Sequence, residues 1–209
     1  LADAHVRLAR GQGAELWRRE ADNEVTSAES LEIYGLKTSP AFEAAVAMGI
    51  RLAGLQPHDL LQVSRYSLHV GTGFQVLNDL KDWQGDLEND RRVAGDVLGG
   101  RPTVMWALAL ENLDDRGREE LLRIKAVCST QQSDTSEETA AAIQTAKKLY
   151  RSAGVFSKAA EIVANERQLA ADAIRDCDYS RLTEVLEFLL DLAVPQQAID
   201  DLLVAESDA

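Results

Sequence analysis

The chain has 209 residues, a hydrophobic content of 45% and a formal net charge of −13. This length supports one sizeable core, and the hydrophobic content is typical of a globular domain rather than of a disordered chain. Because no basic stripe offsets the acidic excess, the composition argues against nucleic-acid binding. The longest apolar run is far shorter than an integral membrane segment requires.

The cysteines and the first residues indicate the cellular compartment in which the protein is expected. Cys128 and Cys177 show neither metal-ligand spacing nor a disulfide framework. The opening LADAHVRLARGQG lacks the compact apolar segment and the cleavage site of a signal peptide, and it starts without methionine, as if partway along a helix. We therefore expect a cytoplasmic protein.

Helical periodicity dominates the chain, and no segment alternates as a half-buried strand does. The expected helices span about residues 2–20, 27–39, 40–54, 57–83, 102–112, 135–151, 155–175 and 181–193. Thr26 and Glu29 predict a capping box at the second helix. Residues 84–102 and 129–138 read as polar loops, and an acidic, fraying tail is expected after Pro195. The pattern predicts a single all-α domain over residues 1–209.

The fourth of these helices carries an acidic run, FQVLNDLKDWQGD, at residues 74–86. At about 100° per residue its polar side chains share one face; they are Gln75, Asn78, Asp79, Asp82 and Asp86. A helix that is apolar over most of its girth is normally interior, so the stripe would face a cavity and need counter-charge. Mg²⁺ could provide this counter-charge, because the ion binds carboxylate and phosphate oxygens. The alternative is a solvated acidic face.

Two further stretches bear on phosphate binding. The segment GDVLGGRPT, at residues 95–103, follows Arg91 and Arg92, and arginine matches the oxygens of phosphate with its planar fork. The segment YGLKTS contains Lys37 and Thr38, which could donate to a phosphate. Taken alone, the first is an ordinary turn and the second an ordinary helix end.

With all three stretches in this order, the sequence resembles the class I (trans) isoprenyl diphosphate synthases, also called polyprenyl synthetases. That family carries a lysine–threonine pair, then FQ-x-x-DD-x-x-D, then a loop ending in D-x-x-x-GK-x-T. Here these motifs read Lys37–Thr38, FQVLNDLKD at residues 74–82 and DVLGGRPT at residues 96–103. GQGAEL at residues 11–16 and the run at 153–174 also resemble family segments. The match covers nearly all of this chain and about the last two-thirds of the family's usual length.

The resemblance implies an isoprenoid synthase-type helical bundle around a central cavity, here expected without its N-terminal helices. It implies a Mg²⁺-dependent enzyme that condenses an allylic diphosphate with isopentenyl diphosphate, and a homodimer. The roles implied by position are metal binding by Asn78, Asp79 and Asp82, diphosphate binding by Lys37, Arg92 and Arg101, and catalysis by Lys37, Thr38 and Gln75. Asp96 would orient the basic loop. The histidines His5, His58 and His69 form no constellation and are interpreted as structural.

Two departures from the family pattern leave alternatives open. Asn78 is neutral where the family has an aspartate, and both arginines replace lysines. The family's first aspartate-rich motif has no counterpart in the chain. Three interpretations stay open: a part of a longer synthase, one chain of a heteromeric synthase, and a diverged, non-catalytic binder. A terpene cyclase is a further alternative, although the metal motif N-x-x-[ST]-x-x-x-E fails at Lys81 and Gly85.

Overall fold

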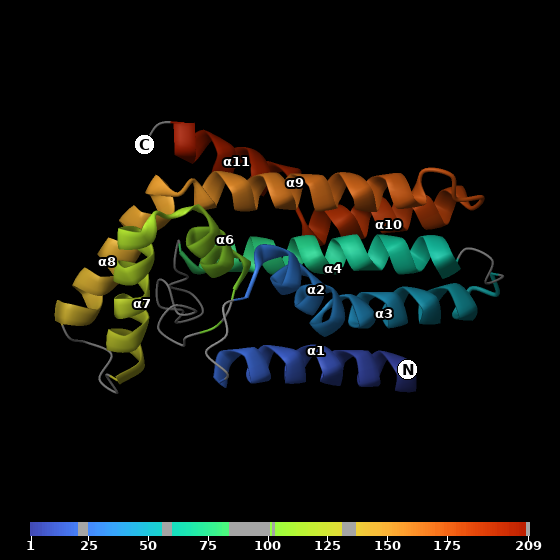
Figure 1. Ribbon diagram of the computed structural model, residues 1–209. Coiled ribbons are helices and arrows are strands. Elements are labelled where there is room, and N and C mark those ends of the chain that lie inside the picture. The colour runs from blue at the N-terminus through green and yellow to red at the C-terminus, as the bar shows by residue number, and fades with distance from the viewer. Residues whose placement is uncertain (21–24, 56–59, 84–100, 102, 131–136, 208–209) are drawn as a thin grey trace. The chain divides into compact units, whose positions relative to one another are not determined.

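The computed structural model describes residues 1–20, 25–55, 60–83, 101, 103–130 and 137–207 (Figure 1). All regular elements within these residues are helices, which confirms the all-α prediction. They are α1 (Ala2–Glu20), α2 (Ser27–Lys37), α3 (Ser39–Leu52), α4 (Leu60–Asp82), α6 (Val104–Asn112), α7 (Asp115–Thr130), α8 (Glu137–Ser152), α9 (Val155–Ile174), α10 (Ser180–Ala193) and α11 (Gln196–Ser207).

The structure differs from the predicted helices in two places. The sequence left α7 unassigned, and its residues are helical from Asp115 onward. The second is the segment after Pro195, to which the sequence assigned no helix and where the structure has α11 to Ser207. Buried Ile199 anchors α11, and Gln196 Nε2 donates to Asp200 Oδ1 over 2.9 Å, a stabilising i,i+4 pair.

The described chain groups into two compact units. Unit 1 comprises residues 1–14, 31–77 and 160–209, and unit 2 comprises residues 15–30 and 78–159. Helix α4 begins in unit 1 and ends in unit 2. The prediction of a single domain stays a prediction.

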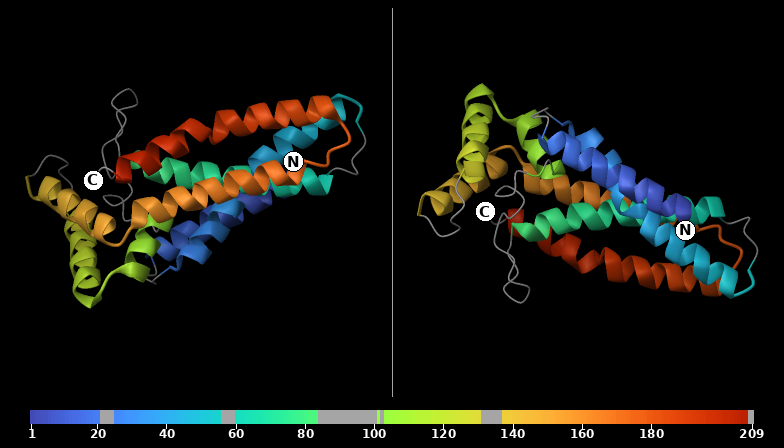
Figure 2. Two further views of the ribbon diagram at one scale, coloured as in Figure 1. Left: turned by 90° about the horizontal axis from the view of Figure 1, so that it is seen from above. Right: turned by 90° about the horizontal axis from the view of Figure 1, so that it is seen from below.

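Unit 1 is built around α4, which lies alongside α3, α9 and α10 in both views of Figure 2. The Tyr66 hydroxyl donates to the Leu186 carbonyl oxygen over 2.6 Å and so ties α4 to α10. Burial of this phenol raises the pKa of Tyr66. On another face of α4, His69 Nδ1 lies 2.8 Å from Glu166 Oε2 of α9. Since the two contacts tie α4 to two different helices, they fix the rotation of α4 within unit 1.

Unit 2 has an aromatic core. The Trp83 ring centre lies 4.6 Å from that of Tyr150 and 5.8 Å from that of Phe156. Helix α6 is buried along its whole apolar length, from Val104 to Leu110. Such a helix has no solvent face, which explains why its residues are almost entirely apolar.

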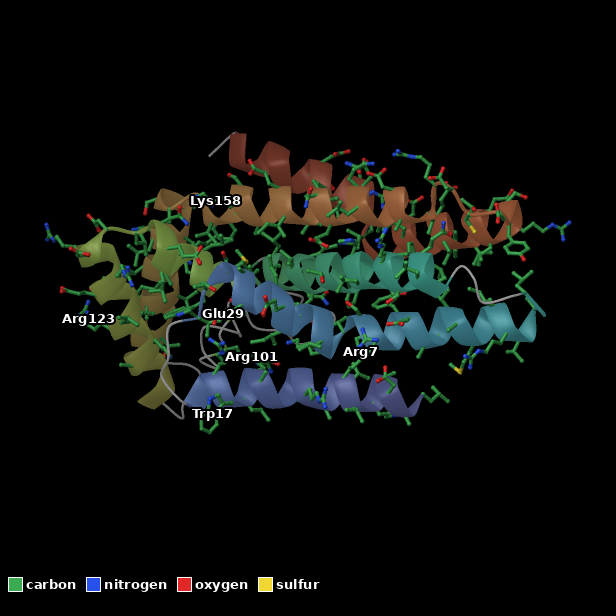
Figure 3. The ribbon with its side chains drawn as sticks, turned by 45° about the vertical axis from the view of Figure 1, so that its right-hand side comes forward. Arg7, Trp17, Glu29, Arg101, Arg123 and Lys158 are labelled. Carbon is green, nitrogen blue, oxygen red and sulfur yellow. The ribbon has the colours of Figure 1, made fainter. Side chains whose placement is uncertain are left out.

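The predicted capping box at the start of α2 is confirmed. Thr26 N donates to Glu29 Oε2 over 2.9 Å, and Glu29 N donates to Thr26 Oγ1 over 3.2 Å. Arg18 also donates to Glu29 Oε1 over 2.8 Å. The Glu29 side chain is labelled in Figure 3. The Arg18 hydrogen bond, followed by those from Thr26, lowers the pKa of Glu29 from 4.5 to about 2.

This capping carboxylate gives a pH-dependent prediction. Because its pKa is lower in the folded chain, ionised Glu29 stabilises the fold above pH 4.5, and this contribution is lost as the pH falls toward 2. Glu29→Gln is therefore expected to lower the Tm at pH 7 and to match the parent chain near pH 2. Thermal unfolding of both chains between these pH values is the measurement, and a Tm difference independent of pH would contradict the assignment.

None of the described helices combines the length and apolarity that a membrane crossing requires.

Candidate functional site

The turn between α2 and α3 places two predicted catalytic residues in contact. Thr38 is the single residue between the two helices; its φ is −125° and its ψ is −50°, and its side chain does not cap α3. Its hydroxyl instead donates to Gln75 Oε1 of α4 over 3.3 Å. Phe42 and Phe74 pack edge to face beside this pair, with ring centres 5.9 Å apart. The structure thus brings together the lysine–threonine motif and the FQ dipeptide.

Two glycines hold this turn against its neighbours. A Cβ on Gly71 of α4 would lie 2.7 Å from Ser39 Cα, and one on Gly11 of α1 would lie 2.5 Å from Lys37 N. Both separations are shorter than real Cβ contacts, so each helix approaches the turn by backbone alone. Ser39 Oγ also donates to the Leu68 carbonyl oxygen over 3.0 Å. The position of Thr38 is therefore set by backbone packing.

Lys37 ends α2 and is half-buried. Its Nζ lies 5.2 Å from the ring centre of Tyr34, a cation–π contact within the same helix. This contact holds the Lys37 side chain against the aromatic face at the end of α2.

The acidic stripe lies on one uninterrupted helix. Gln75, Asn78, Asp79 and Asp82 occupy positions i, i+3, i+4 and i+7 of α4 and therefore share a face, as predicted. Asp79 is only 3% exposed, and Asp82 is half-buried. Burial of a carboxylate is costly unless a charge or hydrogen bonds compensate it. The stripe is therefore not the fully solvated acidic face that was the alternative interpretation.

The same stripe becomes apolar toward the start of α4. Leu61 and Leu68 precede Gln75 by fourteen and seven residues, which keeps all three on nearly the same face. Their side chains are 65% and 42% exposed. Helix α4 thus presents a stripe that begins with accessible leucines and ends with carboxylates.

The donors on α4 fit Mg²⁺ in their chemistry. Among the described residues, no three His, Cys, Asp or Glu side chains gather as a self-sufficient metal cluster. Magnesium sites, however, commonly use one or two carboxylates and complete their coordination with substrate phosphate and water. Asp79 and Asp82, with the amide oxygen of Asn78, supply such a partial set.

The other predicted site residues fall mostly outside the described part of the chain. Asp86, Arg92 and Asp96 lie outside the described residues. Arg101 is described and exposed, and its carbonyl oxygen accepts from Thr103 N over 2.9 Å. Thr103 in turn caps α6 by accepting from Trp106 N over 3.2 Å. The residues that follow Arg101 therefore start helix α6.

The sequence missed the partner of His69. His69 contacts Glu166, which lies 97 positions later in the chain, and no local sequence pattern predicts such a pair. Both side chains are largely buried between α4 and α9, which agrees with the structural interpretation of this histidine.

Comparison with known proteins consistently finds similarity to isoprenyl diphosphate synthases. The family model described as polyprenyl synthetase matches residues 1–144. The short chain isoprenyl diphosphate synthase of Methanothermobacter thermautotrophicus is 29% identical over 125 residues, which are 59% of this chain and 38% of that protein. The geranylgeranyl diphosphate synthase of Methanosarcina mazei is 28% identical over 176 residues, 82% of this chain and 50% of that protein.

Solved structures agree in fold. The geranylgeranyl pyrophosphate synthetase of Pyrococcus horikoshii has a TM-score of 0.76 at 26% identity, covering 93% of this chain and 57% of that one. The polyprenyl synthase of Caulobacter crescentus, complexed with calcium and isoprenyl diphosphate, has a TM-score of 0.77 at 26% identity, covering 94% and 57%. The chain thus spans between 38% and 57% of the length of these four relatives.

Proposed function

Since this chain belongs to the polyprenyl synthetase family, we propose that it acts as a trans-prenyltransferase, which condenses an allylic diphosphate with isopentenyl diphosphate into a longer trans-isoprenyl diphosphate. The observation that carries this proposal is the graded stripe of α4. An allylic diphosphate has an apolar chain and a strongly anionic head. Exposed Leu61 and Leu68 suit the chain, and the carboxylates at Asp79 and Asp82 suit a head that is bound with metal ions.

The proposed reaction needs no protein nucleophile. The allylic carbon–oxygen bond breaks, and its electron pair leaves with pyrophosphate. The double bond of isopentenyl diphosphate then attacks the allylic cation, and the proton lost from the product passes to pyrophosphate. Bound Mg²⁺ would supply electrostatic stabilisation of the charge that develops on the leaving group.

The side chains of this protein have separate roles in the proposal. Asp79 and Asp82, with Asn78, hold the metal. Lys37 and Arg101 bind diphosphate oxygens through their charge, and Arg92, outside the described residues, has the same proposed role. Thr38 and Gln75 hold each other beside the allylic diphosphate, in the orientation set by their 3.3 Å hydrogen bond.

The Thr38 hydroxyl provides a test of this arrangement. Thr38→Val keeps the shape of the side chain but removes the donor, and we expect it to lower kcat/KM by about 10- to 100-fold. Thr38→Ser retains the donor and is expected to stay close to the parent chain. Steady-state kinetics of both variants is the measurement, and equal activity of Thr38→Val and Thr38→Ser would exclude a role for the hydroxyl.

Asn78 favours a second candidate, a diverged subunit that binds an isoprenoid diphosphate without elongating it. An amide in the leading aspartate position offers an oxygen but no charge, which weakens a metal site. Turnover of the parent chain separates the candidates, because a synthase is active with Asn78 in place whereas a diverged binder is not.

The assembly and the compartment are parts of the same proposal. A homodimer is the proposed state, with a heteromeric partner as the alternative, and the proposed location is cytoplasmic. Sedimentation of the purified chain with and without ligand measures the first of these directly.

A further inference from the structure

Helix α1 contacts both of the helices that meet at Thr38. At Gly11 it approaches the end of α2 by backbone alone, since a Cβ there would lie 2.5 Å from Lys37 N. One turn earlier on the same face of α1 lies Arg7, which is labelled in Figure 3. Its Nη1 donates to Glu43 Oε2 of α3 over 2.7 Å. Helix α1 therefore spans the turn within unit 1, with one contact before Thr38 and one after it.

The start of α3 needs a contact from outside because it has no side-chain cap of its own. Thr38 occupies the N-cap position, but its side chain makes no capping hydrogen bond. Its hydroxyl donates instead to Gln75 Oε1 over 3.3 Å. Hydrogen bonds from hydroxyl groups usually measure about 2.5–3.0 Å, so this one is long. A small swing of α3 away from α4 would therefore break it.

The other contacts of the turn fix its place more than its direction. Ser39 packs on the backbone of α4 at Gly71, where a Cβ would lie 2.7 Å from Ser39 Cα. This contact holds the turn at one point of α4 and leaves α3 free to pivot about that point. Glu43 lies four residues after Ser39, one helical turn along α3. A contact at this distance from the pivot restrains the direction in which α3 leaves the turn.

The ion pair between Arg7 and Glu43 is suited to this restraint. The two side chains are only 30% and 28% exposed, and a charge-assisted hydrogen bond of 2.7 Å is strong and directional. Asp3 Oδ2 lies 3.8 Å from the same Arg7 nitrogen, but the Asp3 side chain is 84% exposed and belongs to α1 itself. Of these two acids, Glu43 is therefore the one that joins α1 to α3.

We propose that Arg7 and Glu43 are positioning residues, whose ion pair sets the direction of α3 and so keeps the Thr38 hydroxyl within hydrogen-bonding distance of Gln75. Both act through the turn. A misplacement of about 1 Å caused far from the reacting atoms can lower a rate by about 100-fold, so a single contact at this place can have a large effect. For turnover this inference rests on the proposed function, whereas the restraint on α3 can be measured without substrate.

Hydrogen exchange of the complete encoded polypeptide tests the restraint. Glu43→Arg places like charges opposite each other, and we expect it to speed amide exchange in residues 38–45 by about tenfold or more while leaving residues 70–77 of α4 unchanged. The matched control is Asp3→Arg, which makes the same change of charge beside Arg7 without touching α3. We expect the control to exchange as the parent chain does. Unchanged exchange of residues 38–45 in Glu43→Arg would overturn the proposal.

Rescue by exchanged charges assigns the effect to the pair. Arg7→Glu is expected to behave as Glu43→Arg does, and the double variant Arg7→Glu/Glu43→Arg is expected to recover the exchange rate and the kcat of the parent chain. A double variant no better than either single variant would contradict the pairing. Glu43→Gln removes the charge without reversing it, and it replaces Glu43→Arg in both tests if the reversal does not fold.

Kinetics connects the restraint to the Thr38 hydroxyl. Glu43→Arg is expected to lower kcat about tenfold and to leave KM for the allylic diphosphate within about twofold, because Lys37 stays held at Gly11. In the Thr38→Val background the same substitution is expected to have no further effect, since the hydroxyl through which it acts is absent.

The outcomes separate this inference from the proposed function. Equal losses of kcat in the Thr38 and Thr38→Val backgrounds would assign the ion pair a merely structural role and overturn the proposal. If the parent chain itself shows no turnover, the proposed function fails, and the exchange of residues 38–45 with its rescue decides the role of the ion pair alone.

Discussion

Asp79→Asn is expected to lower Mg²⁺-dependent turnover by about 100- to 1,000-fold, the cost of removing one preorganised group that stabilises developing charge. Asparagine keeps the size of the side chain, so the nearly fully buried position on α4 is not left as a cavity. What is lost is the negative charge that would hold the metal. The measurements are steady-state kinetics and calorimetric titration with diphosphate in the presence and absence of Mg²⁺.

The control for this variant is Asp176→Asn. Asp176 is an exposed aspartate between α9 and α10, and its replacement changes the net charge of the chain by the same amount. We expect it to bind diphosphate and turn over substrate as the parent chain does. If Asp79→Asn behaved like Asp176→Asn, α4 would not hold the metal.

Gly11→Ala is expected to lower the free energy of unfolding by about 1–3 kcal/mol, whereas Gly13→Ala, two residues away on α1, is expected to raise it by about 0.5–1 kcal/mol. A methyl group on Gly11 would collide with the backbone of Lys37, while one on Gly13 meets no described atom within 4 Å. The pair therefore separates close packing from helix propensity, because both changes remove a glycine from the same helix. Urea unfolding of the two variants measures the difference.

The same pair also tests how the turn at Lys37 is held. If packing at Gly11 positions this turn, Gly11→Ala lowers activity at temperatures where the chain is still folded, and Gly13→Ala does not. Equal stability and equal activity of the two variants would contradict the close approach of α1 to the turn.

Much of the fold follows from local patterns in the sequence. The long helix α4 was predictable because apolar residues cover most of its circumference. The start of α2 was predictable from Thr26 and Glu29, which form the capping box in the structure. Helix α7 was not predicted, since only a few of its residues, such as Leu121 and Ile124, are buried and its polar residues resemble a loop. Helix α11 was not predicted, because the burial of Ile199 depends on tertiary packing and not on a local pattern.

The candidate site was predictable as a set of residues but not as an arrangement. Spacing on a helix places Gln75, Asp79 and Asp82 on one face from the sequence alone. The hydrogen bond between Thr38 and Gln75 joins residues 37 positions apart, and the close contacts of Gly11 and Gly71 depend on how three helices meet. Such distances arise from packing, which no local pattern encodes. The roles of Arg92 and Asp96 remain predictions outside the described residues.

The most direct test of the proposed function is the conversion of farnesyl diphosphate by the complete encoded polypeptide, in the presence of Mg²⁺, with and without isopentenyl diphosphate, with the products identified by mass. The account predicts a longer isoprenyl diphosphate that forms only when isopentenyl diphosphate and Mg²⁺ are both present. Hydrocarbon formed without isopentenyl diphosphate, or no product under either condition, would contradict it.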